Sequence, residues 1–204
     1  MRVATSSSIK EPLSIVSVSP FPLGPSDVRV RVVAAGVNPV DWKMREGKGP
    51  LGILHIFLGP SGSMVVGVDF AGEVLEVGSA VTDFRSGSRV VGGTNFARGQ
   101  RGSYADEVVV RQDQCVPLPD NVSFEAAACL PIAAVTAWIA LTEHHQIGPG
   151  HKVLVLGASG GVGSFAVQLV RLLGAQAFGV CSSKNADGVA RLGGTAIDYT
   201  RGDP

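Results

Sequence analysis

The glycine-rich stretch from Lys152 to Val170 constrains the fold of this chain more than any other feature. It reads KVLVLGASGGVGSFAVQLV, and its apolar run 153–156 has the length of a short buried strand. From Ser164 onward the apolar residues follow helical spacing. A turn of small residues therefore joins a strand to a helix, and it presents backbone N–H groups at the positive end of that helix. We interpret the stretch as a cradle for a pyrophosphate.

The glycine spacing alone does not decide between two interpretations. The turn follows G-x-x-G-x-x-G, so it departs from the standard dinucleotide-binding pattern G-x-G-x-x-G by one residue in the first gap. The same glycines are also typical of a helix that packs closely on a strand, and this alternative stays open. If the cradle binds a cofactor, its contacts come from Gly157, Ala158, Ser159, Gly160, Gly161, Val162 and Gly163.

The sequence after the cradle bears on the choice of cofactor. A second strand is predicted from Ala175 to Val180, and Cys181 follows it, then Ser182, Ser183 and Lys184. An NAD-binding unit places an acidic residue at this point, on the ribose hydroxyl. Hydroxyls and a lysine instead suit a 2′-phosphate, because they donate hydrogen bonds and add positive charge. The turn favours NADPH over NADH, with an ordinary solvated lysine as the alternative for Lys184.

Composition excludes several classes of function. The 204 residues are 45% apolar and 17% charged, which allows a sizeable core, and 17 basic residues balance 17 acidic ones. No excess charge attracts nucleic acid or an anionic membrane. The three cysteines show no C-x-x-C spacing, and no apolar run is long enough for a membrane span or a secretory signal. We expect a cytoplasmic protein, with an organelle stroma as the alternative.

Two kinds of pattern follow one another along the chain. The first part is β-rich, with glycines at intervals that suit the bends of a small barrel. Residues 44–64 are rich in glycine and proline and are interpreted as a long loop, either a pocket wall or a surface connection. Prolines at 117 and 119 end the β pattern, so we predict domains at 1–120 and 121–204. Strands are expected at 13–18, 28–33, 65–78, 89–93, 104–110, 153–156, 175–180 and 195–199, and helices from 124, at 133–145, from 164 and at 186–192.

Six motifs occur in one order along the chain. They are GVNPVDWK (36–43), GVDFAGEVLEVGSAVTDFRSGSRVVG (67–92), GSYADEVVV (102–110), AACLPIAAVTAW (127–138), the glycine turn, and SSKN (182–185) with IDY (197–199). With them the chain resembles the zinc-independent NADPH:quinone oxidoreductases of the medium-chain dehydrogenase/reductase superfamily, the chloroplast-envelope homologues above all. The resemblance implies an α/β plus β fold, in which a GroES-like β-barrel domain precedes a Rossmann dinucleotide-binding domain. Only three strands of the second domain are counted, so we expect it to appear truncated after its third strand.

The resemblance also implies roles for single residues. Zinc-dependent members carry ligands at positions that hold Asn38, Val68 and Ile132 here, and none of these binds zinc, so we expect no metal. Asn38 is implied beside the nicotinamide and the substrate, and it is the one residue assigned to catalysis; a turn residue is the alternative. We expect Asp41 only to order its loop. The implied cofactor contacts are Thr136 at the nicotinamide, the glycine turn at the pyrophosphate, and Ser182, Ser183, Lys184 and Tyr199 around the 2′-phosphate.

The resemblance finally implies an enzyme. The expected reaction is hydride transfer from NADPH to a quinone or a related conjugated carbonyl (enone), without zinc. Reduction of an activated alkene on the same scaffold is one alternative, and a non-catalytic NADPH-binding relative is another. The partners implied are small molecules, and the full-length family member allows a homo-oligomer.

Overall fold

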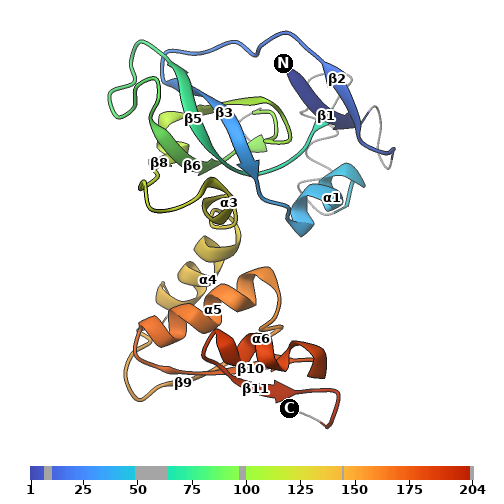
Figure 1. Cartoon of the computed structure of the whole chain (residues 1–204), viewed down its shortest axis with the longest axis vertical. Coiled ribbons are helices and arrows are strands. Elements are labelled where there is room, and N and C mark those ends of the chain that lie inside the picture. Colours follow the sequence, from blue (N-terminus) through green and yellow to red (C-terminus); the bar gives the residue numbers. More distant parts are fainter. Residues whose placement is uncertain (7–10, 49–63, 97–99, 144, 203–204) are drawn as a thin grey trace. The chain divides into compact units, whose positions relative to one another are not determined.

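The computed structural model of the chain describes residues 1–6, 11–48, 64–96, 100–143 and 145–202 (Figure 1). Contacts divide it into two compact units, Met1–Pro131 and Ile132–Pro204. The helix that follows residue 123 packs against strands of the first unit. The division into domains at residues 120 and 121 stays a prediction. Residues 49–63, most of the expected long loop, lie outside the described part of the chain.

The first unit is built from antiparallel strands. One sheet has the order β7-β3-β5-β6-β8 and another has the order β2-β1-β4, so neighbours in space come from distant parts of the sequence (Figure 1). Shifts in register between β3 and β5 bend the larger sheet. The elements of the first unit are β1 (Arg2–Ser6), β2 (Ser14–Ser17), β3 (Asp27–Ala35), α1 (Pro39–Arg45), β4 (Met64–Val65), β5 (Asp69–Val77), β6 (Arg89–Gly93), β7 (Glu107–Arg111), η2 (Gln112–Gln114), β8 (Cys115–Pro117) and α3 (Phe124–Ala127).

Alternating side chains give this unit its core. In β3, Val28 and Val30 are fully buried while Arg29 and Arg31 point to the other side, as the alternation in the sequence predicted. Phe70 on β5 is also fully buried among the valines of β3, β6 and β7. Strands β1 and β8 and helix α1 are among the elements that were not predicted from the sequence. Strand β1 is short and polar. Helix α1 is seven residues long and lies within a stretch that was expected to be extended or a loop.

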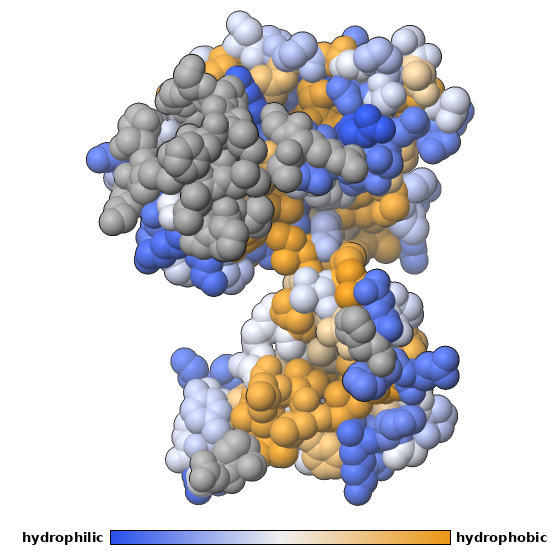
Figure 2. Space-filling model, turned by 180° about the vertical axis from the view of Figure 1, so that it is seen from behind, coloured by the Kyte–Doolittle hydropathy of each residue, from blue (hydrophilic) through white to orange (hydrophobic). Residues whose placement is uncertain are grey.

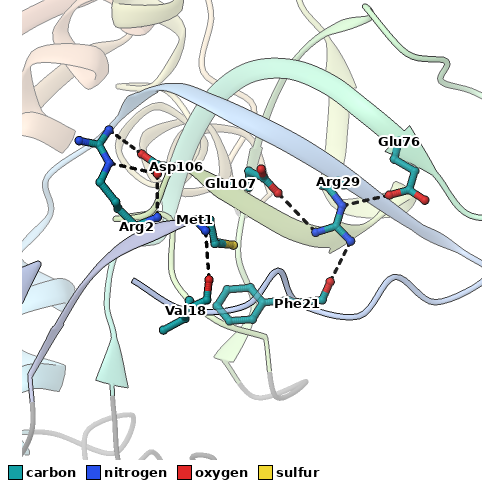
Figure 3. A network of polar contacts seen from close by, with 8 residues as sticks. All are labelled: Met1, Arg2, Val18, Phe21, Arg29, Glu76, Asp106 and Glu107. Carbon is teal, nitrogen blue, oxygen red and sulfur yellow. Dashed lines mark hydrogen bonds and ion pairs between the residues drawn. The ribbon is translucent and has the colours of Figure 1, made fainter. Parts of the chain in front are cut away.

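Ion pairs join the strands of the first unit. The Arg29 guanidinium on β3 donates to Glu76 on β5 at 3.2 Å, to Glu107 on β7 at 3.4 Å and to the Phe21 carbonyl at 2.8 Å (Figure 3). Its side chain is only 12% exposed, so the three acceptors replace the water that burial removes. Arg2 of β1, in the smaller sheet, forms an ion pair at 2.9 Å with Asp106, which directly precedes β7 of the larger sheet (Figure 3).

The second unit holds a parallel sheet, which confirms the predicted α/β character. Its order is β11-β10-β9, the order expected of three consecutive strands joined by crossover helices (Figure 1). Helix α5 begins at Gly161, three residues before the helical spacing starts in the sequence. The elements are α4 (Ala133–Thr142), β9 (Lys152–Leu156), α5 (Gly161–Leu172), β10 (Gln176–Cys181), η3 (Ser183–Asn185), α6 (Ala186–Arg191) and β11 (Thr195–Asp198).

One face of this sheet packs against helices, whereas side chains of β9 on the other face are exposed. Val155 of β9 is buried in a core with residues of α4, α5 and α6. Leu154 and Leu156, which point to the opposite face, are 56% and 72% exposed. Figure 2 shows apolar side chains gathered on a face of this unit. Within the described residues, no helix has the length and apolar character needed to cross a membrane.

Candidate functional site

The glycine turn links β9 to α5 through a sharp change in backbone direction. Gly157 follows the strand with φ of 68°, a left-handed conformation that side chains disfavour. The N–H of Ala158 then donates to the Val180 carbonyl of β10 at 3.0 Å, and the N–H of Gly160 donates to the Gly157 carbonyl at 2.9 Å. These bonds hold the turn against the sheet and place Gly160 as the residue that precedes α5.

The glycines of the turn have different reasons to be glycine. At Gly163 a Cβ atom would lie 2.3 Å from the Gly157 carbonyl oxygen, so this residue is required by packing. At Gly161 the nearest atom to an added Cβ is 3.8 Å away, at Ala133. Gly161 and Val162 are exposed, and they belong to the first turn of α5, where N–H groups have no intrahelical partner. Close packing therefore accounts for Gly163, whereas the pyrophosphate contact at the exposed Gly161 stays a prediction.

An asparagine connects the turn to the end of the next strand. The Asn185 side-chain nitrogen donates to the Ser159 hydroxyl at 3.0 Å and to the Ser182 hydroxyl at 3.3 Å. Ser159 comes from the glycine turn, whereas Ser182 follows β10. The two segments that were predicted to bind one cofactor are thus held together by Asn185, which sequence reasoning did not single out although it ends the SSKN motif.

The other predicted contacts of the 2′-phosphate surround a carboxylate. Asp198, the last residue of β11, pairs in register with Cys181, so the end of β11 lies beside the end of β10. The Ser183 hydroxyl donates to Asp198, and the Thr200 hydroxyl donates to it at 2.6 Å. Lys184 and Tyr199 are exposed in the same region. The sequence interpretation found no acidic residue at the end of the second strand; in space, the third strand supplies one.

Asp198 is charged at neutral pH. Its pKa is held below the ordinary value, chiefly because the Ser183 hydroxyl donates to it, then because Thr200 does. The N–H of Thr200 also donates to the carboxylate at 2.9 Å, and the Arg201 guanidinium lies 3.4 Å away.

Thr136, the remaining predicted contact in this unit, lies exposed on α4, the helix that packs beside α5.

In the first unit, Asn38 is held by two buried carboxylates. It precedes α1 with an extended backbone, as its position before a proline predicted. Its side-chain nitrogen donates to Asp69 at 2.9 Å, and its backbone N–H donates to Asp41 at 2.7 Å. Because a carboxylate only accepts, the amide nitrogen of Asn38 faces Asp69.

The two carboxylates lie in surroundings that favour neutral groups. Asp41 is 3% exposed and Asp69 is 1% exposed. Burial raises the pKa of Asp41, against the opposing effect of the donors Asn38 and Tyr104. The Tyr104 hydroxyl donates to Asp41 at 2.9 Å, and its own pKa is raised by burial and then by the negative charge of Asp41. Asp41 thus orders the loop before α1, as expected, and Asp69 orients the side chain of Asn38.

These surroundings do not resemble a metal centre. Within the described ranges, which omit His55 and His144, no three His, Cys, Asp or Glu side chains gather in a way that could hold a metal ion. The side chain of Val68 carries no atom that can ligate a metal.

Comparison with known proteins agrees with this architecture. Residues 24–120 match the alcohol dehydrogenase GroES-like domain. The quinone oxidoreductase of Coxiella burnetii superposes on the whole chain with a TM-score of 0.90 and 30% identity. The chain belongs to the medium-chain dehydrogenase/reductase superfamily. The predicted GroES-like domain and Rossmann-type sheet of this superfamily are therefore confirmed.

Other members of the superfamily are similar over comparable lengths. A zinc-type alcohol dehydrogenase-like protein of Schizosaccharomyces pombe is 40% identical over 90% of this chain. Escherichia coli quinone oxidoreductase complexed with NADPH is 26% identical over 99% of the chain, with a TM-score of 0.81. The chain spans 52% of the length of the Schizosaccharomyces pombe protein, 59% of the Escherichia coli protein and 63% of the Coxiella protein.

Proposed function

We propose that this superfamily member is an NADPH-dependent oxidoreductase that transfers hydride to a quinone or a related conjugated carbonyl without zinc. The observation that supports it most is the exposed first turn of α5 at Gly161, beside a loop that carries Ser182, Ser183 and Lys184. A relative with the same fold is complexed with NADPH, and two of the relatives are named quinone oxidoreductases.

The residues of the second unit fit such a cofactor. The N–H groups of Gly161 and Val162 bind the pyrophosphate, since glycine at 161 leaves the helix end uncovered. Lys184 and the serine hydroxyls bind the 2′-phosphate, and Thr136 contacts the nicotinamide side. The bound cofactor supplies the hydride, and the protein supplies position and exclusion of water.

In the first unit, Asn38 orients the substrate. Asp69 fixes the orientation of its amide, and Asp41 fixes its backbone. A quinone is electrophilic without a Lewis acid, so the amide has only to position it. Asn38 and Val68 stand where zinc-dependent relatives carry ligands and neither supplies a zinc ligand, which supports a mechanism without zinc. We further propose a reducing location, cytoplasmic or in an organelle stroma, because the three cysteines are free. We also propose that the full-length enzyme is a homo-oligomer.

The test is an assay of NADPH and NADH oxidation with a quinone and with a 2-alkenal, on the wild type and on Gly161→Asp. An aspartate at the first helical position favours the helix, yet it repels a pyrophosphate. The fold should therefore persist, while affinity for NADPH falls roughly a hundredfold. Gly161→Ala is the matched control and should retain most of the affinity.

The outcomes separate the alternatives. Faster turnover of the alkenal than of the quinone would assign the alkene reductase activity instead. NADPH binding without turnover of either substrate would indicate a non-catalytic binding protein. Equal binding of NADPH by Gly161→Asp and the wild type contradicts the proposed pyrophosphate site.

A further inference from the structure

The carboxylate of Asp198 lies where a dinucleotide's adenosine ribose is expected. In doubly wound sheets, the ribose hydroxyls lie beyond the carboxyl end of the second strand, which is β10 in this chain. Asp198 belongs to β11, but its register with Cys181 places it beside that end. Asp198 accepts a hydrogen bond from the hydroxyl of Ser183, a residue that is proposed to bind the 2′-phosphate.

This carboxylate competes with a 2′-phosphate in two ways. First, it accepts hydrogen bonds from donors that a phosphate also needs, namely the hydroxyls of Ser183 and Thr200, and it holds Arg201 at 3.4 Å. Second, its negative charge repels the phosphate. Neither effect opposes a 2′-hydroxyl, which can donate to a carboxylate.

We propose that Asp198 is a specificity-determining residue that weakens the binding of an adenosine 2′-phosphate relative to a 2′-hydroxyl. The inference rests on the proposed function, because it assumes that the end of β10 holds the adenosine of a dinucleotide. Lys184 favours the phosphate and Asp198 opposes it, so the preference for NADPH is set by the balance of the two. The side chain of Asp198 is 17% exposed, which leaves it accessible to a ligand.

The test compares two nucleotides that differ only at the 2′ position of the ribose. Adenosine 2′,5′-bisphosphate and 5′-AMP share the adenosine and the 5′-phosphate, so the ratio of their Kd values isolates the 2′ group. Calorimetric titrations of both are made on the wild type, on Asp198→Asn and on Glu143→Gln. Glu143 is an exposed acid at the end of α4 in the same unit, and its substitution removes the same charge away from β10.

Asp198→Asn should shift the ratio roughly fivefold in favour of the bisphosphate, because repulsion is removed and the bound hydroxyls are released. Glu143→Gln should leave the ratio at the wild-type value. Far-ultraviolet circular dichroism checks that each variant is folded. If Asp198→Asn is unfolded, Asp198→Ser is titrated instead, since a serine hydroxyl can still accept from Thr200.

Each outcome decides a separate point. An unchanged ratio in a folded Asp198 variant overturns this inference and leaves the proposed function standing. An equal shift in Glu143→Gln also overturns it, since long-range charge would then explain the effect. Failure of the wild type to bind either nucleotide defeats the proposed function, and the inference fails with it.

Discussion

The two units each place a carboxylate beside proposed binding residues, yet the surroundings shift the pKa of the two groups in opposite directions. Asp41 in the first unit is buried, and desolvation raises its pKa despite three hydrogen-bond donors. Asp198 in the second unit is half-buried at the end of a strand, and its hydrogen bonds lower its pKa. Desolvation outweighs hydrogen bonding only where water is excluded. We therefore expect substitutions of Asp41 to change the free energy of unfolding, and substitutions of Asp198 to change the affinity for nucleotides.

The largest expected effect is at Asp41. Asp41→Ala leaves the hydroxyl of Tyr104 and the N–H of Asn38 without their acceptor, so the free energy of unfolding should fall by about 3 kcal/mol. Trp42 is the tryptophan of the first unit, and its fluorescence in a Trp138→Phe background follows urea unfolding there.

The matched control for Asp41→Ala is Asp198→Ala, which should leave the Trp42 transition at the urea concentration of the background protein. A destabilisation below about 1 kcal/mol at Asp41 would show that water replaces the lost acceptor, contrary to the burial of this group.

The next effect is at the exposed turn of the second unit. Lys184→Glu replaces an attractive charge by a repulsive one, so Kd for NADPH should rise roughly thirtyfold while Kd for NADH stays nearly constant. Fluorescence titrations measure both constants. Lys152→Glu, at the opposite end of β9, is the control and should change neither. Equal weakening of NADH and NADPH by Lys184→Glu would remove the 2′-phosphate assignment.

A smaller effect is expected at Asp69. Asp69→Asn keeps an oxygen that accepts from Asn38 but removes the charge, so the free energy of unfolding should fall by about 1 kcal/mol. The side-chain amide resonances of Asn38 in a ¹H–¹⁵N spectrum should move, because the hydrogen bond weakens. Asp69→Ala should move them further. Unchanged amide resonances in both variants would contradict the orienting role of Asp69.

The smallest effect concerns the pH dependence of stability. Because burial raises the pKa of Asp41, the folded chain binds this proton more tightly than the unfolded chain does. The resulting stabilisation is complete below the unfolded pKa, near 3.8, and is lost as pH rises through the higher folded value. Asp41→Asn removes this dependence. Urea unfolding at several pH values should therefore show the wild type losing stability relative to Asp41→Asn as pH increases, whereas parallel curves would contradict the raised pKa.

Local patterns predicted the parts of the fold that depend on local physics. The alternation around Val28 and Val30 predicted a strand with one buried face, and the apolar run before Gly157 predicted β9. Strand β1 was missed because its residues lack strong alternation, and it forms by pairing with β2 and β4. Helix α1 was missed because Pro39 and the following glycines suggested a loop, although proline is well suited to the first helical position.

The candidate site was predicted only in part. The spacing of Gly157 to Gly163 indicated the turn, and the SSKN motif indicated the residues after β10. Neither pattern revealed Asp198, because parallel pairing of β10 and β11 brings together residues that are far apart in the chain. The role of Asp69 was likewise hidden, since only the packing of β5 beside the loop before α1 places it at Asn38.

The sequence by itself determined which chemical groups are available and the backbone forms they favour: glycines that open a helix end, a proline that extends Asn38, and a serine-lysine turn. These follow from the conformational limits of each residue and its near neighbours. The tertiary structure alone decided which carboxylates are buried and which donors they meet. Burial and long-range pairing set the pKa of Asp41 and of Asp198, and both depend on residues that are distant in sequence.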